Sequence, residues 1–252
     1  MDITSIVGIG GLFSLIAVAI ATGQVSSVFL NAHGFLVVLG GAFVAMMINT
    51  PLALALDAAK SLVVLFRGRV GIDAQYVVPL LITASQNVHA RGINALGGLD
   101  QKVAGGFLAR AAQVAMEFKD PKYVQEVLES EIKREFEYHN EIVNFYRTLS
   151  ILFPMFGLIG TLLGIVDVLK QISNPEQVGP AMAVAITSAF YGISLANLFA
   201  TPVAGKLRLK FLEEYMAKAV IIEGVIEILK GTVPVLVERR MEAYLPALPQ
   251  KV

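Results

Sequence analysis

The chain contains no cysteine, and its charged side chains are scarce and unevenly placed. Without thiols, disulfide bonds and thiolate metal sites are excluded. The three histidines, His33, His89 and His139, lie far apart and show no metal-ligand spacing, so no metal site is predicted. Lys and Arg number 20, as do Asp and Glu, and this zero net charge gives nucleic-acid binding little electrostatic support.

Charged residues make up only 16% of the 252 residues, against about 25% in soluble domains. Asp, Glu, Lys and Arg are all missing from three blocks, residues 3–56, 148–166 and 177–205. A helix needs about 20 apolar residues to cross a bilayer, so the first block has room for two spans and each other block for one. The expected fold class is an all-α integral membrane protein with four transmembrane helices.

The predicted spans are residues 3–22, 34–51, 148–170 and 180–204. The expected organisation is transmembrane helices 1 and 2 within residues 1–51, a cytoplasmic helical domain at 52–147, transmembrane helices 3 and 4 at 148–204, and cytoplasmic C-terminal helices at 205–252. The first span is interpreted as retained, because Asp2 stands where a cleavable signal peptide has basic residues.

The distribution of basic residues predicts the orientation in the membrane. Eleven of the 20 Lys and Arg lie in residues 52–147 and eight in residues 205–252. Only Lys170 is left for the external links between spans. Because basic residues concentrate on the cytoplasmic side of membrane proteins, both polar segments and both termini are expected in the cytoplasm.

Within the cytoplasmic segment, amphipathic helices are predicted over residues 52–66, from near residue 74, and over residues 101–118. Gly97 and Gly98 are expected to break the second of these helices. A further helix is expected to begin at Pro121, a residue suited to the first helical turn. It should continue towards Arg147 and enter the third span without a full break.

Span three concentrates small and polar residues on one side. Their spacings of three, four and three positions place them on one helix face: Pro154, Gly157, Thr161 and Gly164. Such a stripe suits either close helix packing or the lining of a polar path, and the residues leave both interpretations open. Span four adds the hydroxyls of Thr187, Ser188 and Ser194, which can also bond to the preceding turn of their own helix.

An acidic residue is missing from the predicted middle of the membrane. Proton paths usually need a carboxylate there. Asp167, the nearest candidate, lies about 28 Å along the helix from Thr148 and so close to the outer surface. Lys170, three residues on, can pair with it. Asp167 is therefore interpreted as part of an interfacial ion pair, and any carboxylate for an ion path must come from another protein.

Several segments resemble the MotA/PomA stator proteins of bacterial flagellar motors, within the wider MotA/TolQ/ExbB group. The family's opening and second span are similar to MDITSIVGIGG and VLGGAFVA here. Its third- and fourth-span motifs match FPMFGLIGTLLGIV and AITSAFYGISLANLFATPVAGKL, and its cytoplasmic ending matches EGVIEILKGTVPVLVERRMEAYLP. The resemblance covers nearly the whole chain. Two spans before the long cytoplasmic segment favour this branch over the three-span TolQ and ExbB proteins.

The resemblance implies a stator subunit of an ion-driven rotary motor in the bacterial inner (cytoplasmic) membrane. Five such subunits would surround two copies of a single-span partner of the MotB/PomB type, which supplies the missing aspartate. The motif match places Pro154, Thr161 and Pro202 beside that aspartate. The predicted ion pathway also includes Gly157, Thr187, Ser188 and Tyr191. No cofactor is expected beyond the transported ion.

The cytoplasmic segment departs from the family's usual rotor contacts. Members typically carry Arg-Lys-Glu-Gly with a glutamate five residues later, whereas the run from His89 reads HARG and the glutamate position is Gly97. Arg91 thus occupies the family's acidic position. Contact with a rotor protein of the FliG type is therefore assigned to His89, Arg91, Asp100 and Lys102, or else the motor drives something other than a standard flagellum.

The transported ion is interpreted as H⁺ rather than Na⁺. Thr161 matches the threonine of sodium-driven members, which some proton-driven members share. Ala189 stands two residues before Tyr191, where members often have threonine, and so removes one sodium ligand.

Three functions compete: the stator, an ExbB/TolQ-like or gliding-type energiser with another load, and a passive membrane scaffold. An enzyme is not predicted, and no catalytic residue is assigned. The sequence shows neither a constellation of nucleophile, base and metal nor a phosphate loop.

Overall fold

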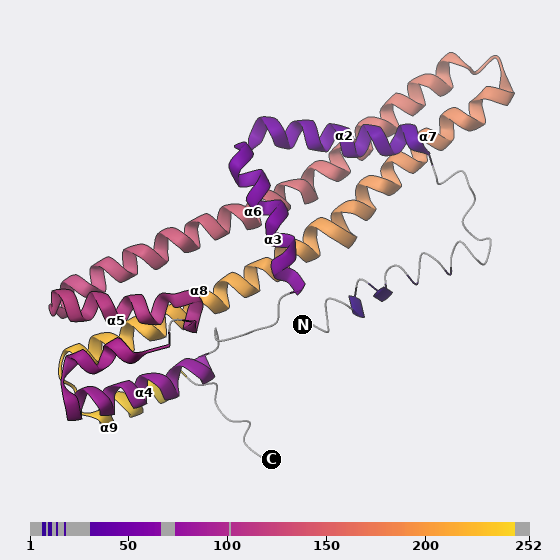
Figure 1. The fold of residues 1–252 in the computed structure, drawn as a ribbon. Helices are drawn as coiled ribbons and strands as arrows, with labels where there is room; N and C mark the ends of the chain where they lie inside the picture. Colours follow the sequence, from indigo (N-terminus) through magenta and orange to yellow (C-terminus); the bar gives the residue numbers. More distant parts are fainter. Residues whose placement is uncertain are drawn as a thin grey trace. The chain divides into compact units, whose positions relative to one another are not determined.

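The computed structural model describes residues 31–66, 74–100 and 102–244, together with six isolated positions nearer the N-terminus. Helices and turns account for these residues, and no β-strand occurs among them. Figure 1 labels the principal helices. The predicted all-α class is confirmed. The predicted first span, residues 3–22, lies outside the described residues apart from the isolated positions.

The chain divides into two compact units. The first unit consists of Met1–Arg67 and Asn140–Arg208, and the second of Gly68–His139 and Leu209–Val252. Two long helices, α6 (Pro121–Lys170) and α8 (Thr201–Leu229), contribute residues to both units. Each unit has its own hydrophobic core.

The first unit contains α2 (Ala32–Asn49), α3 (Leu52–Phe66), the C-terminal part of α6, α7 (Pro175–Ser194), the π-helix η4 (Leu195–Ala200) and the first residues of α8. Its core joins α2, α6 and η4 through Val38, Ala42, Phe153, Ala196 and Ala200. The buried Tyr146 hydroxyl of α6 donates to the Ala58 carbonyl of α3 at 2.6 Å. This bond fixes α3 against α6.

Three of the described helices are long and apolar enough to cross a bilayer: Ala32–Asn49, Pro121–Lys170 and Glu176–Leu229. The second and third contain 50 and 54 residues, far more than the roughly 20 that a span needs. Only part of each can therefore lie in the hydrocarbon core. The charge-free stretches at 148–166 and 177–205 are the parts that fit, which leaves the charged residues 121–147 and 206–229 outside it.

The predicted helix over residues 52–66 is confirmed by α3, and the continuous helix from Pro121 into the third span is confirmed by α6. The prediction that Gly97 and Gly98 break the helix from residue 74 is wrong. That helix, α4 (Ala74–Arg91), ends earlier, and both glycines lie in the 3₁₀-helix η2 (Ile93–Gly98). Gly92 ends α4 because its φ of 82° is left-handed, a conformation that favours glycine.

One other boundary differs from prediction. The link between the third and fourth spans was expected at residues 171–179, but α7 already begins at Pro175, where proline suits the first turn. The fourth span and the helix expected after residue 204 join without a break, because the helical backbone continues through η4 and α8 to Leu229.

The second unit packs α4, α5 (Phe107–Phe118), parts of α6 and α8, and α9 (Pro234–Glu242) around a core that includes Leu81, Leu108, Leu128, Ile221 and Met241. Arg240 of α9 binds Glu223 and Glu227 of α8, each at 2.9 Å. Burial opposes the charge of Glu227, but hydrogen bonds from Lys230 and Thr232 and the charges of Lys230 and Arg240 outweigh it and lower its pKa. The charged carboxylate therefore helps to hold α9 on α8.

Candidate functional site

Helices α6 and α7 approach each other closely at glycines in the first unit. A Cβ atom added at Gly192 of α7 would lie 2.6 Å from the carbonyl oxygen of Phe153. One added at Gly157 of α6 would lie 3.0 Å from the carbonyl oxygen of Ser188. Because the nearest atoms belong to the backbone, a side chain at either position requires the helices to move apart. Small residues permit this kind of close contact between membrane helices.

Thr161 and Gly164 continue the same contact along α6. The Thr161 hydroxyl lies 3.0 Å from the carbonyl oxygen of Gly157 on its own helix and 3.2 Å from that of Ala185 on α7. A Cβ atom added at Gly164 would lie 2.7 Å from the backbone nitrogen of Ala185. The predicted stripe of α6 therefore packs against α7 at Gly157, Thr161 and Gly164.

Ser188 lies where α2, α6 and α7 meet. It is fully buried, and its hydroxyl donates to the Val184 carbonyl one turn earlier at 2.7 Å. Cβ atoms added at Gly34 of α2 and Gly160 of α6 would lie 2.9 Å and 2.5 Å from the Ser188 hydroxyl oxygen. Glycines on two different helices thus enclose one small hydroxyl group.

Thr187 and Tyr191 of α7 also contact α2. Thr187 is buried and donates to the backbone of its preceding turn at 2.7 Å, and its hydroxyl oxygen would lie 3.0 Å from a Cβ atom at Gly34. The Tyr191 hydroxyl accepts a hydrogen bond from the backbone nitrogen of Asn31 at 3.1 Å. Its ring stands edge-on to Phe35, with centroids 5.6 Å apart. Tyr191 therefore ties the beginning of α2 to α7.

Pro154 and Pro202 contribute to the helices in different ways. Pro154 is half-buried within an uninterrupted stretch of α6. Pro202 is exposed in the first turn of α8, directly after the π-helix, in which the Thr201 N–H bonds to the Ala196 carbonyl five residues back. Proline has no N–H to donate, and π turns often occur at functional sites. The change from π-helix to α-helix therefore occurs beside Pro202, whereas the helix around Pro154 stays α-helical.

The structure brings most of the predicted pathway residues to one junction of α2, α6 and α7: Gly157, Thr161, Thr187, Ser188 and Tyr191. Gly34, Gly160 and Gly192 share this junction and were not predicted. One signal for them is present in the sequence. Small residues recur every three or four positions along α7 and η4, and all are buried: Ala181, Ala185, Ser188, Gly192, Ala196 and Ala200.

These junction residues offer hydroxyl and carbonyl oxygens but no carboxylate. Asp167, the nearest predicted acidic candidate, binds Lys170 at 3.1 Å, and its side chain is 54% exposed. The predicted ion pair is confirmed. Hydroxyl and carbonyl oxygens can bond to water or a cation, but they do not take up and release protons near neutral pH.

The four predicted rotor-contact residues are exposed in the second unit. His89 and Arg91 lie in the last turn of α4. Asp100 and Lys102 follow η2, where the Asp100 carboxylate accepts a hydrogen bond from the backbone nitrogen of Lys102 at 2.9 Å. Asp100 is thus engaged in a local turn, whereas Arg91 presents its charge at a helix end.

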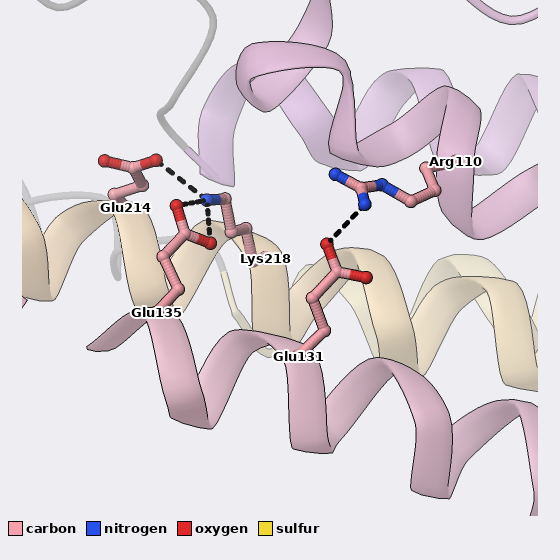
Figure 2. Close-up of polar contacts among 5 residues, drawn as sticks. All are labelled: Arg110, Glu131, Glu135, Glu214 and Lys218. Carbon is pink, nitrogen blue, oxygen red and sulfur yellow. Dashed lines mark hydrogen bonds and ion pairs between the residues drawn. The ribbon is translucent and has the colours of Figure 1, made fainter. Parts of the chain in front are cut away.

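A buried charged group in the second unit was not predicted. Lys218 is 5% exposed and donates to both oxygens of Glu135 at 2.7 Å and to Glu214 at 2.8 Å (Figure 2). Burial opposes the charge of Lys218, but its bonds to these carboxylates outweigh burial and raise its pKa. Nearby, Arg110 of α5 binds Glu131 of α6 at 3.2 Å. In the sequence, only the four-residue spacing of Glu214 and Lys218 signals this group.

Long apolar helices that pack through glycines and small hydroxyl residues are typical of α-helical membrane proteins. Residues 100–219 match the profile of the MotA/TolQ/ExbB proton channel family. Motility protein A of Aquifex aeolicus is 31% identical to this chain, and the alignment covers the whole of both chains. The chain belongs to the MotA/TolQ/ExbB proton channel family.

Further similarities extend over nearly the full length. PomA, a chemotaxis protein of Vibrio alginolyticus, is 25% identical over 97% of this chain and 96% of its own. The solved structure of C. jejuni MotAB superposes with a TM-score of 0.87 at 22% identity and covers 100% of this chain and 99% of the matched one. The flagellar MotAB stator complex of Bacillus subtilis gives 0.87 at 24% identity, with 97% and 96% covered. The fold is therefore shared along the chain.

The close packing of α6 and α7 predicts a position-dependent effect of alanine. Gly164→Ala places a Cβ atom 2.7 Å from the Ala185 backbone, and such overpacking typically costs about 1–3 kcal/mol. We expect a lower midpoint of thermal unfolding, measured by circular dichroism on the purified full chain in detergent. Gly179→Ala is the matched control, because a Cβ atom there meets nothing within 4 Å. Equal midpoints for both variants would contradict the close helix contact.

Proposed function

We propose that the chain is the stator subunit of an ion-driven rotary motor of the flagellar type and that it works with a single-span partner of the MotB/PomB type. The family and the relatives named Motility protein A and PomA support this function. The observation that carries it is the junction of buried hydroxyl groups without a carboxylate. Such a wall can line an ion path, but an aspartate of the partner must bind and release the ion.

The proposed assembly is a ring of five subunits around two partner copies in the bacterial inner membrane. The four spans begin with residues 3–22. Both large polar segments and both termini lie in the cytoplasm. The concentration of Lys and Arg in residues 52–147 and 205–252 supports this orientation. So does the placement of the charged parts of α6 and α8 beyond the charge-free stretches.

The proposed ion path passes Pro154, Gly157, Thr161, Thr187, Ser188, Tyr191 and Pro202. Thr161 supports this path most directly, because its single hydroxyl hydrogen is shared between carbonyl oxygens of two helices. A small shift of α6 along α7 frees one of these oxygens for water or an ion. H⁺ is proposed as the ion, since Ala189 removes one oxygen that sodium would use.

A second candidate function is an energiser of the ExbB/TolQ or gliding type. It is favoured by the departure from the usual rotor contacts, with Arg91 at the family's acidic position and Gly97 at its glutamate position. The domain that follows the partner's single span distinguishes the two functions. A peptidoglycan-binding domain favours the stator, and a domain that belongs to another machine favours the energiser.

The ion path is tested by Thr161→Val in the complex with the partner, reconstituted into liposomes. Loss of one hydrogen bond costs about 1 kcal/mol, so we expect proton flux to fall by about fivefold or more. Thr83→Val is the control, because Thr83 is exposed and bonds within α4 at 2.9 Å. Unchanged flux in Thr161→Val would remove this residue from the path. Flux that requires a sodium gradient would show that Na⁺ is the ion.

The proposed rotor contact is tested by reversing the charge of Arg91. In a motile strain that depends on this gene, Arg91→Glu should reduce swimming speed, because it changes an exposed charge at the end of α4. Proton flux in liposomes should stay at the wild-type level, since ion conduction does not use this residue. Lys119→Glu, an exposed lysine after α5, is the control. Normal swimming in Arg91→Glu would rule out Arg91 as a rotor contact.

A further inference from the structure

A histidine is stacked on a phenylalanine beside the buried Lys218. The rings of His139 on α6 and Phe211 on α8 are nearly parallel, at 9°, with centroids 4.0 Å apart. Phe211 is buried, and His139 is half-buried. Both residues belong to the second unit and lie outside the charge-free stretches that fit the membrane. In the proposed orientation, His139 lies on the cytoplasmic side of the membrane.

The charged side chains that face His139 are Glu135 on its own helix and Glu214 and Lys218 on α8. The remaining titratable residue that lines the same gap, Tyr215, packs its ring against Phe136, with centroids 4.6 Å apart. Two of these three charges are negative, and both carboxylates attract a proton to His139, whereas Lys218 repels it.

Glu135 of α6 connects this helix to α8 through Lys218. Both of its carboxylate oxygens contact the Lys218 ammonium at 2.7 Å, while Glu214 lies on the same helix as Lys218 (Figure 2). Glu135 also precedes His139 by four residues, a spacing at which helical side chains meet. A protonated His139 that donates to Glu135 competes with Lys218 for the same carboxylate, and this competition weakens the bridge between α6 and α8.

We propose that His139, Phe211, Glu135, Glu214 and Lys218 form a cytoplasmic proton sensor. Proton uptake by His139 draws Glu135 away from Lys218 and loosens the packing of α6 on α8. The response of this cluster to protons does not depend on the proposed function, whereas its cytoplasmic location rests on the proposed orientation. Its consequence, a response of the motor to acidification of the cytoplasm, does rest on that function.

The lowered pKa of His139 agrees with looser packing of α6 on α8 at low pH. Burial is the largest influence on His139 and lowers its pKa, and the nearby Glu214 and Glu135 only partly oppose it. The pKa therefore lies below the ordinary value of 6.5, so the unfolded chain binds the proton more tightly than the folded one. The neutral histidine therefore favours the folded chain fully above 6.5, and this stabilisation is lost as the pH falls from that value through the lowered pKa of the folded state.

The sensor is tested by amide hydrogen exchange and mass spectrometry on the purified full chain in detergent, with rates corrected for the intrinsic effect of pH. Peptides around His139 and Phe211 should lose protection as the pH falls from about 7.5 to about 5.5, the range around an ordinary histidine pKa. The loss should be at most about tenfold per pH unit, because one proton is linked to the change. Wild-type protection that does not depend on pH would overturn the proposal.

Three variants test which residues cause the dependence of amide protection on pH. His139→Phe keeps a ring on Phe211 but cannot titrate, so protection of these peptides should not change with pH. Glu135→Gln removes the carboxylate that bridges to Lys218, so the amides around it should have low protection at every pH. His89→Phe, which alters an exposed histidine, should respond as the wild type does. A wild-type response in His139→Phe or Glu135→Gln would overturn the proposal. Because no ion gradient is used, this failure is distinct from failure of the proposed function.

Discussion

The first unit depends on the direct approach of the α6 and α7 backbones. Between helices in lipid there is little hydrophobic driving force, so close packing must supply the attraction. Gly157 and Gly192 provide it by bringing backbone atoms of the two helices into contact, and Gly34 adds α2 to the same place. A larger residue at Gly192 would meet the Phe153 carbonyl. The contact also brings the Thr161 hydroxyl of α6 within 3.2 Å of the Ala185 carbonyl of α7.

Close packing and a polar path are compatible here because the hydroxyls are small and already satisfied. Thr187 and Ser188 bond to carbonyls of their own helix, and Thr161 shares its hydrogen between α6 and α7. These bonds remove the cost of burying polar groups in the membrane. They also leave the junction without a group that changes its charge near neutral pH. The proposed path for protons along this wall would therefore need an acid from a second protein.

The fold class was predictable because membrane burial leaves a strong signal in the sequence. The charge-free stretches identified the apolar parts of α2, α6 and α7, and Pro121 marked the beginning of α6. Helix ends were harder to predict. Gly92 ends α4 because its backbone has a positive φ. Gly97 and Gly98 are also glycines, but their φ angles are not positive, and composition alone does not distinguish the three. Lys206 and Arg208 favour helices, which agrees with the helix expected after residue 204.

Residue spacing predicted the candidate sites only where their residues share one helix, and the family resemblance was needed to combine α6 with α7. Spacing identified Gly157 and Thr161 as one face of α6, but it could not show that this face meets Ala185 and Ser188. The pair of Glu135 and Lys218 is separated by 83 positions. No local pattern reports such a contact, because it arises only when α6 and α8 pack together.

The central claim is that this subunit forms the wall of an ion path but contributes no acid to it. Proton uptake into liposomes tests this claim most directly, with a membrane potential applied to the purified subunit alone, to its complex with the single-span partner, and to the complex whose partner carries asparagine for aspartate. The account predicts flux only in the unaltered complex. Flux at the same rate from the subunit alone would contradict it.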